Sequence, residues 1–121
     1  LMHLIRNAVD HGIESRGCVT VRASLDDETG WASIEVSDNG KGIDAKRIRS
    51  RAIEIDILDP KSDLKDSSCL GFIFHPGFST RDQITEVSGR GVGLAIVKSQ
   101  VEKKDGKIEI FTKPNEGSGF K

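Results

Sequence analysis

Three residues near the start of the chain could bind a metal ion and phosphate groups together. His3, Asn7 and His11 recur every four residues, so at about 100° per residue a helix places them on one stripe, with Asp10 beside it. An asparagine carbonyl can bind Mg²⁺, and a histidine can hydrogen-bond a phosphate or an activated oxygen. For a single helix, a solvated face is the commoner explanation of such a stripe, so both interpretations stay open.

A second group, Asp-Asn-Gly-Lys-Gly at residues 38–42, could recognise a purine base. Asp38 continues the alternation of the apolar residues before it, so an extended strand would point its carboxylate toward the core side. A carboxylate in that position needs a partner. The exocyclic amine of a purine would supply one, with Gly40 and Gly42 leaving room for the ring. Such clusters are more often plain turns, which is the alternative interpretation.

A third group, Gly-Arg-Gly-Val-Gly at residues 89–93, stands where a helix is expected to begin. Free amides and the helix dipole at such a position favour an anion, so the segment could hold phosphates. It could equally be a flexible hinge. The spacing differs from the dinucleotide-binding and P-loop patterns.

Helices and a hairpin must position these groups. In chain order we predict a helix over 1–10 with Gly12 as its C-cap, a hairpin of strands over 18–25 and 31–38, a helix over 45–58 capped by Asp44, a polar loop over 59–68, a helix over 93–104 and a strand over 107–112. Residues 81–88 are predicted to be mobile, and residues 117–121 to form a glycine-rich turn. Helices available for one face of an antiparallel hairpin predict an α+β two-layer sandwich.

The apolar pattern also predicts which faces are buried. The first helix is expected to bury the arc of Leu1, Met2, Leu4, Ile5, Ala8 and Val9, and the second strand to bury Ala32, Ile34 and Val36.

Composition narrows the class of protein. The 121 residues carry a net charge of −1, which does not favour a nucleic-acid partner. No apolar stretch is long enough to cross a membrane. Two cysteines without a CxxC spacing argue against zinc and against a disulfide scaffold, and suit the cytoplasm. Because both ends fall inside structural patterns, we expect residues 1–121 to be one domain that is truncated at both ends.

Together these groups resemble the ATP-binding domain of the GHKL superfamily, and most of all that of CheA-type chemotaxis histidine kinases. HLIRNAVDHGIE (3–14) is similar to their N-box, and DNGKGID (38–44) to their first glycine box. FIFHPGFST (72–80) is similar to their phenylalanine box, and EVSGRGVGL (86–94) to their second glycine box. One departure is the short connection after HGIE, where only Ser-Arg-Gly stands before the next strand.

The resemblance implies a Bergerat-type α+β sandwich, with a mixed sheet, helices on one face, and bound ATP and Mg²⁺. It implies that Asp38 binds the adenine amine, that Gly42 lies beside the ring, that Gly40 also belongs to the nucleotide site, and that Asn7 is the metal ligand. His3 and His11 would act near the phosphates. The remaining nucleotide-binding positions that it implies are Asp10, Ser79, Thr80, Gly89, Gly91, Gly93 and Leu94, of which Ser79 and Thr80 would start a lid.

As a function, the resemblance implies transfer of the ATP γ-phosphoryl group to a histidine on a separate domain of the same kinase. The parent kinase would be dimeric through another domain. An alternative is a degenerate module that binds nucleotide without transfer. A third possibility, an ATPase of the gyrase or chaperone kind, ranks lowest because those enzymes usually carry a glutamate base where this chain has His3.

Overall fold

The computed structural model describes residues 1–78 and 93–121, and the chain divides into two compact units. The first unit comprises Leu1–Ile43 and Gly106–Lys121, and the second comprises Asp44–Asp105. Helices and an antiparallel sheet make up these units, which confirms the α+β class.

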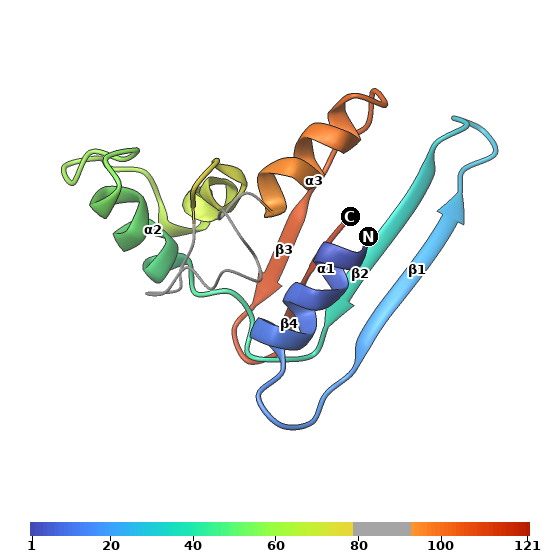
Figure 1. The fold of residues 1–121 in the computed structure, drawn as a ribbon, viewed down its shortest axis with the longest axis horizontal. Coiled ribbons are helices and arrows are strands. Elements are labelled where there is room, and N and C mark those ends of the chain that lie inside the picture. The colour runs from blue at the N-terminus through green and yellow to red at the C-terminus, as the bar shows by residue number, and fades with distance from the viewer. Residues whose placement is uncertain (79–92) are drawn as a thin grey trace. The chain divides into compact units, whose positions relative to one another are not determined.

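The first unit is built on a four-stranded sheet in the order β1-β2-β4-β3 (Figure 1). The strands are β1 (Val19–Leu25), β2 (Ala32–Asp38), β3 (Ile110–Lys113) and β4 (Gly117–Phe120). All three pairings in the sheet are antiparallel, so the expectation of a mixed sheet was wrong for the described part of the chain. The hairpin of β1 and β2 is confirmed.

The glycine-rich segment near residue 120 is a strand, which corrects the prediction of a turn. β4 lies between β2 and β3, and all four of its residues are buried. A Cβ on Gly119 would lie 2.3 Å from the ring of Phe111, and one on Gly117 would lie 1.9 Å from the carbonyl oxygen of Asp38. The glycines therefore allow close approach within the sheet.

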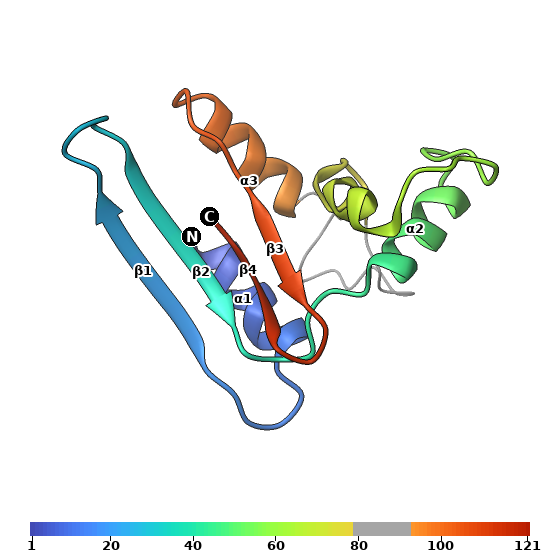
Figure 2. The same ribbon diagram turned by 180° about the vertical axis from the view of Figure 1, so that it is seen from behind.

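One helix covers a face of this sheet. It begins as α1 (Met2–Asn7) and continues as the π-helix η1 (Ala8–Gly12). In Figure 1 it lies in front of β2 and β4, and in Figure 2 it lies behind them. Leu4 and Ala8 are buried, as are Val36 and Phe120 on the sheet.

The predicted core face of this helix was too wide. Leu1, Met2 and Val9 are 57%, 72% and 53% exposed, because a single sheet face receives only the stripe that contains Leu4 and Ala8. The prediction for β2 was too long in the same way. Val36 is buried, whereas Ala32 and Ile34 are exposed, since the helix covers only the end of β2 near Asp38.

The second unit contains α2 (Ala45–Glu54), the 3₁₀-helix η2 (Asp66–Phe74) and α3 (Gly93–Glu102). The predicted cap is confirmed, because the Asp44 side chain accepts hydrogen bonds from the backbone N–H groups of Lys46 and Arg47. α2 ends four residues earlier than predicted. Asp56 has a φ of 60°, and the next N–H turns back to the carbonyl of Ala52.

The loop between α2 and η2 is held by one arginine. The guanidinium of Arg49 donates to the carbonyl oxygens of Ser62 and Leu64. Most of the polar loop predicted over 59–68 is confirmed, although η2 already begins at Asp66. Among the helices of residues 1–78 and 93–121, none is long and apolar enough to span a membrane.

Candidate functional site

The carboxylate of Asp38 is held at the end of β2, where the sheet meets the helix. Asp38 pairs with Ser118 of β4 in the sheet register. The Ser118 hydroxyl donates to Asp38 Oδ2 over 2.9 Å, and Ser118 is only 7% exposed. The predicted orientation of Asp38 toward the core side agrees with this contact. The partner that a carboxylate needs there is supplied in part by the protein itself.

The other carboxylate oxygen closes a tight turn. The N–H of Gly40 donates to Asp38 Oδ1 over 2.9 Å, which is the hydrogen bond of an Asx-turn. With one fixed donor on each oxygen, the carboxylate cannot rotate freely. Its remaining lone pairs keep a defined direction, and these are what a further donor would meet.

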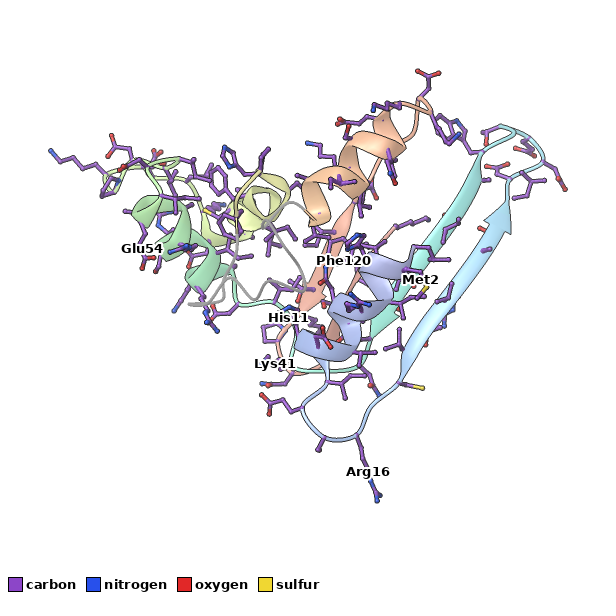
Figure 3. All side chains as sticks on the ribbon, in the orientation of Figure 1. Met2, His11, Arg16, Lys41, Glu54 and Phe120 are labelled. Atoms are coloured by element: carbon purple, nitrogen blue, oxygen red, sulfur yellow. The ribbon has the colours of Figure 1, made fainter. Side chains whose placement is uncertain are left out.

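The end of η1 packs directly against this turn. A Cβ on Gly12 would lie 2.6 Å from Asp38 Cγ, and a Cβ on Gly40 would lie 1.6 Å from the carbonyl oxygen of Gly12. That carbonyl accepts a hydrogen bond of 3.0 Å from the N–H of Lys41. Figure 3 shows His11 and Lys41 in this region, with Arg16 pointing away from it. Only glycine fits at positions 12 and 40 in this arrangement.

The segment of residues 38–42 is held as closely by the turn between β3 and β4. Gly42 has a φ of +79°, and its Cβ would lie 2.7 Å from the carbonyl oxygen of Lys113. The Thr112 hydroxyl accepts a hydrogen bond of 2.8 Å from the N–H of Ile43. The N–H of Asn115 donates to the carbonyl of Lys41 over 2.9 Å. At residues 40 and 42 the missing side chains thus make room for the protein's own backbone.

The stripe predicted for His3, Asn7 and His11, with Asp10 beside it, does not lie on one continuous α-helix. α1 contains His3 and ends at Asn7, whereas Asp10 and His11 belong to the π-helical turn. The spacing by which residues i and i+4 of an α-helix lie on one face therefore applies only as far as Asn7. Asn7 is half-buried, while His3, Asp10 and His11 are exposed. π-turns of this kind are frequent at functional sites.

The predicted phosphate-binding residues are only partly described. Ser79, Thr80, Gly89 and Gly91 lie outside the described residues. Gly93 and Leu94 open α3 in the second unit. That unit also contains a shallow hollow of about 340 Å³, which holds none of the predicted site residues. Its walls are largely aliphatic and are formed by Pro76, Ala95, Ile96, Ser99, Gln100 and Lys103.

Sequence reasoning missed several residues that contact Asp38 or hold the segments around it. Ser118 was part of the segment interpreted as a turn, although a serine between two glycines, two residues before Phe120, fits the period of a strand. Gly12 was predicted only as a helix cap, and Asn39 and Thr112 were assigned no role. Their importance depends on contacts between distant parts of the chain, which no local pattern signals.

Comparisons with known proteins agree with the motifs. The family model described as "Histidine kinase-, DNA gyrase B-, and HSP90-like ATPase" matches residues 1–121. The chain is 40% identical over 131 aligned residues to a chemotaxis protein CheA of Rhizobium meliloti, covering 99% of this chain and 17% of the relative. It is 41% identical over 133 residues to a chemotaxis protein CheA of Halobacterium salinarum, covering 99% and 20%.

A third relative, the sensor histidine kinase CheAY of Helicobacter pylori, is 36% identical over 129 residues, covering 98% of this chain and 16% of the relative. The chain thus spans between about a sixth and a fifth of the length of these curated relatives. The similarity includes both the first helix, over α1 and η1, and the segment of residues 38–42, which surround the carboxylate of Asp38.

Proposed function

The chain belongs to the family of histidine kinase-, DNA gyrase B-, and HSP90-like ATPases, and on this premise we propose that it is the ATP-binding catalytic domain of a CheA-like two-component histidine kinase. In this proposal the γ-phosphoryl group of ATP passes to a histidine on a separate domain. The observation that carries it is the fixed carboxylate of Asp38, enclosed by Gly12, Gly40 and Ser118.

Asp38 is proposed to recognise the adenine base. Its two oxygens already accept from Ser118 and Gly40, so their direction is set before a ligand arrives. The exocyclic amine of adenine would donate to the carboxylate, forming a charge-assisted hydrogen bond. Guanine carries a carbonyl at that position and would present a second acceptor to Asp38. Such a site discriminates strongly, because the mismatched base leaves polar groups without partners.

Asn7 is proposed as the protein ligand of Mg²⁺. Among residues 1–78 and 93–121, no cluster of three or more histidine, cysteine or acidic side chains could hold a metal ion. The single amide oxygen of the half-buried Asn7 fits Mg²⁺ nonetheless, since this ion keeps several waters and takes further oxygens from substrate phosphates. When bound, the metal would neutralise charge on the transferred group.

The proposed roles of the other residues concern the phosphates and the acceptor. His3, His11 and Asp10 are proposed to lie near the phosphate groups, and the start of α3 at Gly93 and Leu94 to offer backbone N–H groups. None of the three histidines stands in a recognisable acceptor sequence, so the phosphorylated histidine belongs to another domain. The same proposal includes a dimeric parent kinase, with the dimer formed through another domain, and a cytoplasmic location.

A degenerate nucleotide-binding module is the second candidate function. It would bind the nucleotide through the same carboxylate of Asp38, but it would not transfer the γ-phosphoryl group. The presence of Asn7 and of both glycine boxes in the sequence favours the kinase. The third candidate, an ATPase of the gyrase or chaperone kind, is disfavoured because His3 stands in place of the usual glutamate.

One experiment separates these functions. Calorimetry would measure ATP, ADP and GTP binding with and without Mg²⁺ for the parent chain and for Asn7→Ala. We expect the variant to bind metal-free ADP almost as well as the parent, but to lose most of the gain in affinity that Mg²⁺ gives. Single-turnover transfer to a supplied acceptor domain should fall most, because metal neutralises charge in that step.

The control for this experiment is His75→Ala, which changes an exposed polar side chain of the second unit that has no proposed role. Parent-like Mg²⁺ dependence and transfer in folded Asn7→Ala would remove Asn7 from the mechanism. Tight ATP binding by the parent without transfer to any acceptor domain would favour the degenerate module.

A further inference from the structure

The pairing of β1 with β2 has an irregular last step, one residue beyond the two strands. In an antiparallel ladder, a hydrogen-bonded residue pair exchanges two backbone hydrogen bonds. The pair that follows Val19 and Asp38 in the register is Cys18 with Asn39. The N–H of Asn39 donates to the carbonyl of Cys18 over 3.2 Å, as a regular ladder requires.

The second bond of this pair is made by a side chain. The N–H of Cys18 donates to Oδ1 of Asn39 over 2.7 Å. The amide oxygen of the Asn39 side chain thus stands where a regular ladder would use the backbone carbonyl of the same residue. The last donor of β1 keeps a partner, although the backbone of β2 has already turned away.

Because the side-chain oxygen of Asn39 replaces a backbone acceptor, β2 can leave the sheet at Asn39, directly after Asp38 of the candidate site. From Asn39 the chain turns so that the N–H of Gly40 reaches Asp38 Oδ1 at 2.9 Å. The same turn brings Gly40 against the carbonyl oxygen of Gly12 and allows Lys41 to donate to that carbonyl at 3.0 Å. Asn39 is the middle residue of the turn that fixes the carboxylate.

We propose that Asn39 is a positioning residue for Asp38: its side chain takes over the ladder bond of Cys18 and so holds the turn in which the carboxylate faces the base. The inference rests on the proposed function for its consequence in nucleotide binding. The exposed side chain of Asn39 itself needs no contact with the nucleotide. Its effect is transmitted through the orientation of Asp38.

The test compares the 121-residue parent chain with Asn39→Ala and Asn39→Asp. Alanine removes the acceptor, whereas aspartate keeps an oxygen at the same distance from the backbone. In nucleotide-free protein, NMR hydrogen exchange of the Gly40 amide should be about tenfold faster in Asn39→Ala and near the parent rate in Asn39→Asp. ATP affinity should fall roughly three- to tenfold in Asn39→Ala, as for loss of one ordinary hydrogen bond, and recover in Asn39→Asp.

A readout of base recognition separates positioning from general destabilisation. Inorganic tripolyphosphate binding should be unchanged in Asn39→Ala, and the preference for ATP over GTP should shrink by the same factor as ATP affinity. The matched control is Glu14→Gln, which breaks an exposed ion pair of 3.3 Å between the same two segments, Glu14 with Lys41. Its effect on each quantity should stay within about twofold.

Two outcomes would overturn the inference. One is an unchanged Gly40 exchange rate in folded Asn39→Ala. The other is an equal loss of affinity for ATP, GTP and tripolyphosphate, which would mean a purely structural role. If the parent chain itself bound no ATP, the proposed function would fail, and the exchange rates with their rescue by aspartate would still decide the positioning role of Asn39.

Discussion

Two turns at opposite ends of the β1–β2 hairpin begin with an aspartate, and they differ in what surrounds it. At the tip, Asp26 Oδ1 accepts the N–H groups of Glu28 and Thr29 at 3.0 and 3.2 Å. At the other end, Asp38 Oδ1 accepts the N–H of Gly40 at 2.9 Å. The local chemistry is alike, because in both turns an aspartate oxygen binds a backbone N–H two residues later.

Their long-range partners are what separate the turns. The hydrogen bonds of the tip join residues 26–31 to one another, and a Cβ on Gly30 would meet nothing within 4 Å. The turn at Asp38 is enclosed by Gly12 on the helix and by Ser118 on β4. An aspartate turn of this kind therefore becomes a candidate site only where distant segments also contact its carboxylate, as Ser118 does at Asp38 Oδ2.

The largest contrast is expected from adding one methyl group to each turn. Gly40→Ala places a Cβ on the backbone carbonyl of Gly12, and we expect it to destabilise the folded chain by about 3 kcal/mol, as strong overpacking does. Gly30→Ala meets open space and should cost only about 1 kcal/mol, because its φ of +73° disfavours alanine. Urea unfolding monitored by circular dichroism would measure both. Equal losses would mean that the two turns are equally free.

The next contrast concerns the two carboxylates. Asp38→Asn keeps the size of the side chain but would remove the proposed charge-assisted bond to adenine, so we expect a loss of about 1.5–3 kcal/mol, or roughly ten- to a hundredfold in ATP affinity. Asp26→Asn should leave ATP affinity unchanged. Calorimetry on both variants, with GTP as the second ligand, provides the measurement. Similar affinities of the parent for ATP and GTP would count against the role of Asp38.

A smaller effect is expected from the partner on β4. Ser118→Ala removes the hydroxyl that donates to Asp38 Oδ2, and ATP affinity should fall about fivefold, equivalent to about 1 kcal/mol. The control is Ser33→Ala, which removes a hydroxyl from the part of β2 near the tip. If Ser118→Ala bound ATP as tightly as the parent, the orientation of Asp38 would not depend on β4.

The smallest effect is a pH dependence confined to the tip. Hydrogen bonds from the Thr29 side chain, and then from the backbone N–H groups of Thr29 and Glu28, lower the pKa of Asp26 below its ordinary value of 3.8. A lowered pKa contributes stability that is present above the ordinary value and is lost as the pH falls through the folded value. NMR titration should show faster Thr29 amide exchange only below about pH 3.8, and no such step in Asp26→Asn.

Local patterns were enough to predict most elements of the fold. The alternation of apolar residues located β1 and β2, and Asp44 marked the start of α2. The predicted direction of the Asp38 carboxylate also follows from strand parity alone. These features depend on neighbours a few residues apart, which a single sequence displays.

Features that depend on packing were not predictable in this way. The sequence of β4 contains two glycines, which disfavour a strand unless a neighbouring backbone or ring needs their space, as Phe111 needs that of Gly119. The π-turn after Asn7 shifts Asp10 and His11 off an α-helical stripe without any signal in residue type. The width of the buried helix face likewise depends on how much sheet lies beneath it.

The place of β4 in the sheet has a consequence for the order of folding. β3 and β4 form a local hairpin, as β1 and β2 do, and the four-stranded sheet is complete only when β4 pairs with β2. That pairing joins distant parts of the chain, because Ser118 is 80 residues from Asp38. Contacts of such long range slow folding, because the entropy of loop closure is lost before they form. Until the two hairpins dock, the inner edges of β2 and β4 are unpaired and open to pairing with other chains. Asp38 acquires its hydrogen-bond partner on β4 only when β2 and β4 pair, so the β1–β2 hairpin alone lacks the Ser118 donor that helps to fix the carboxylate.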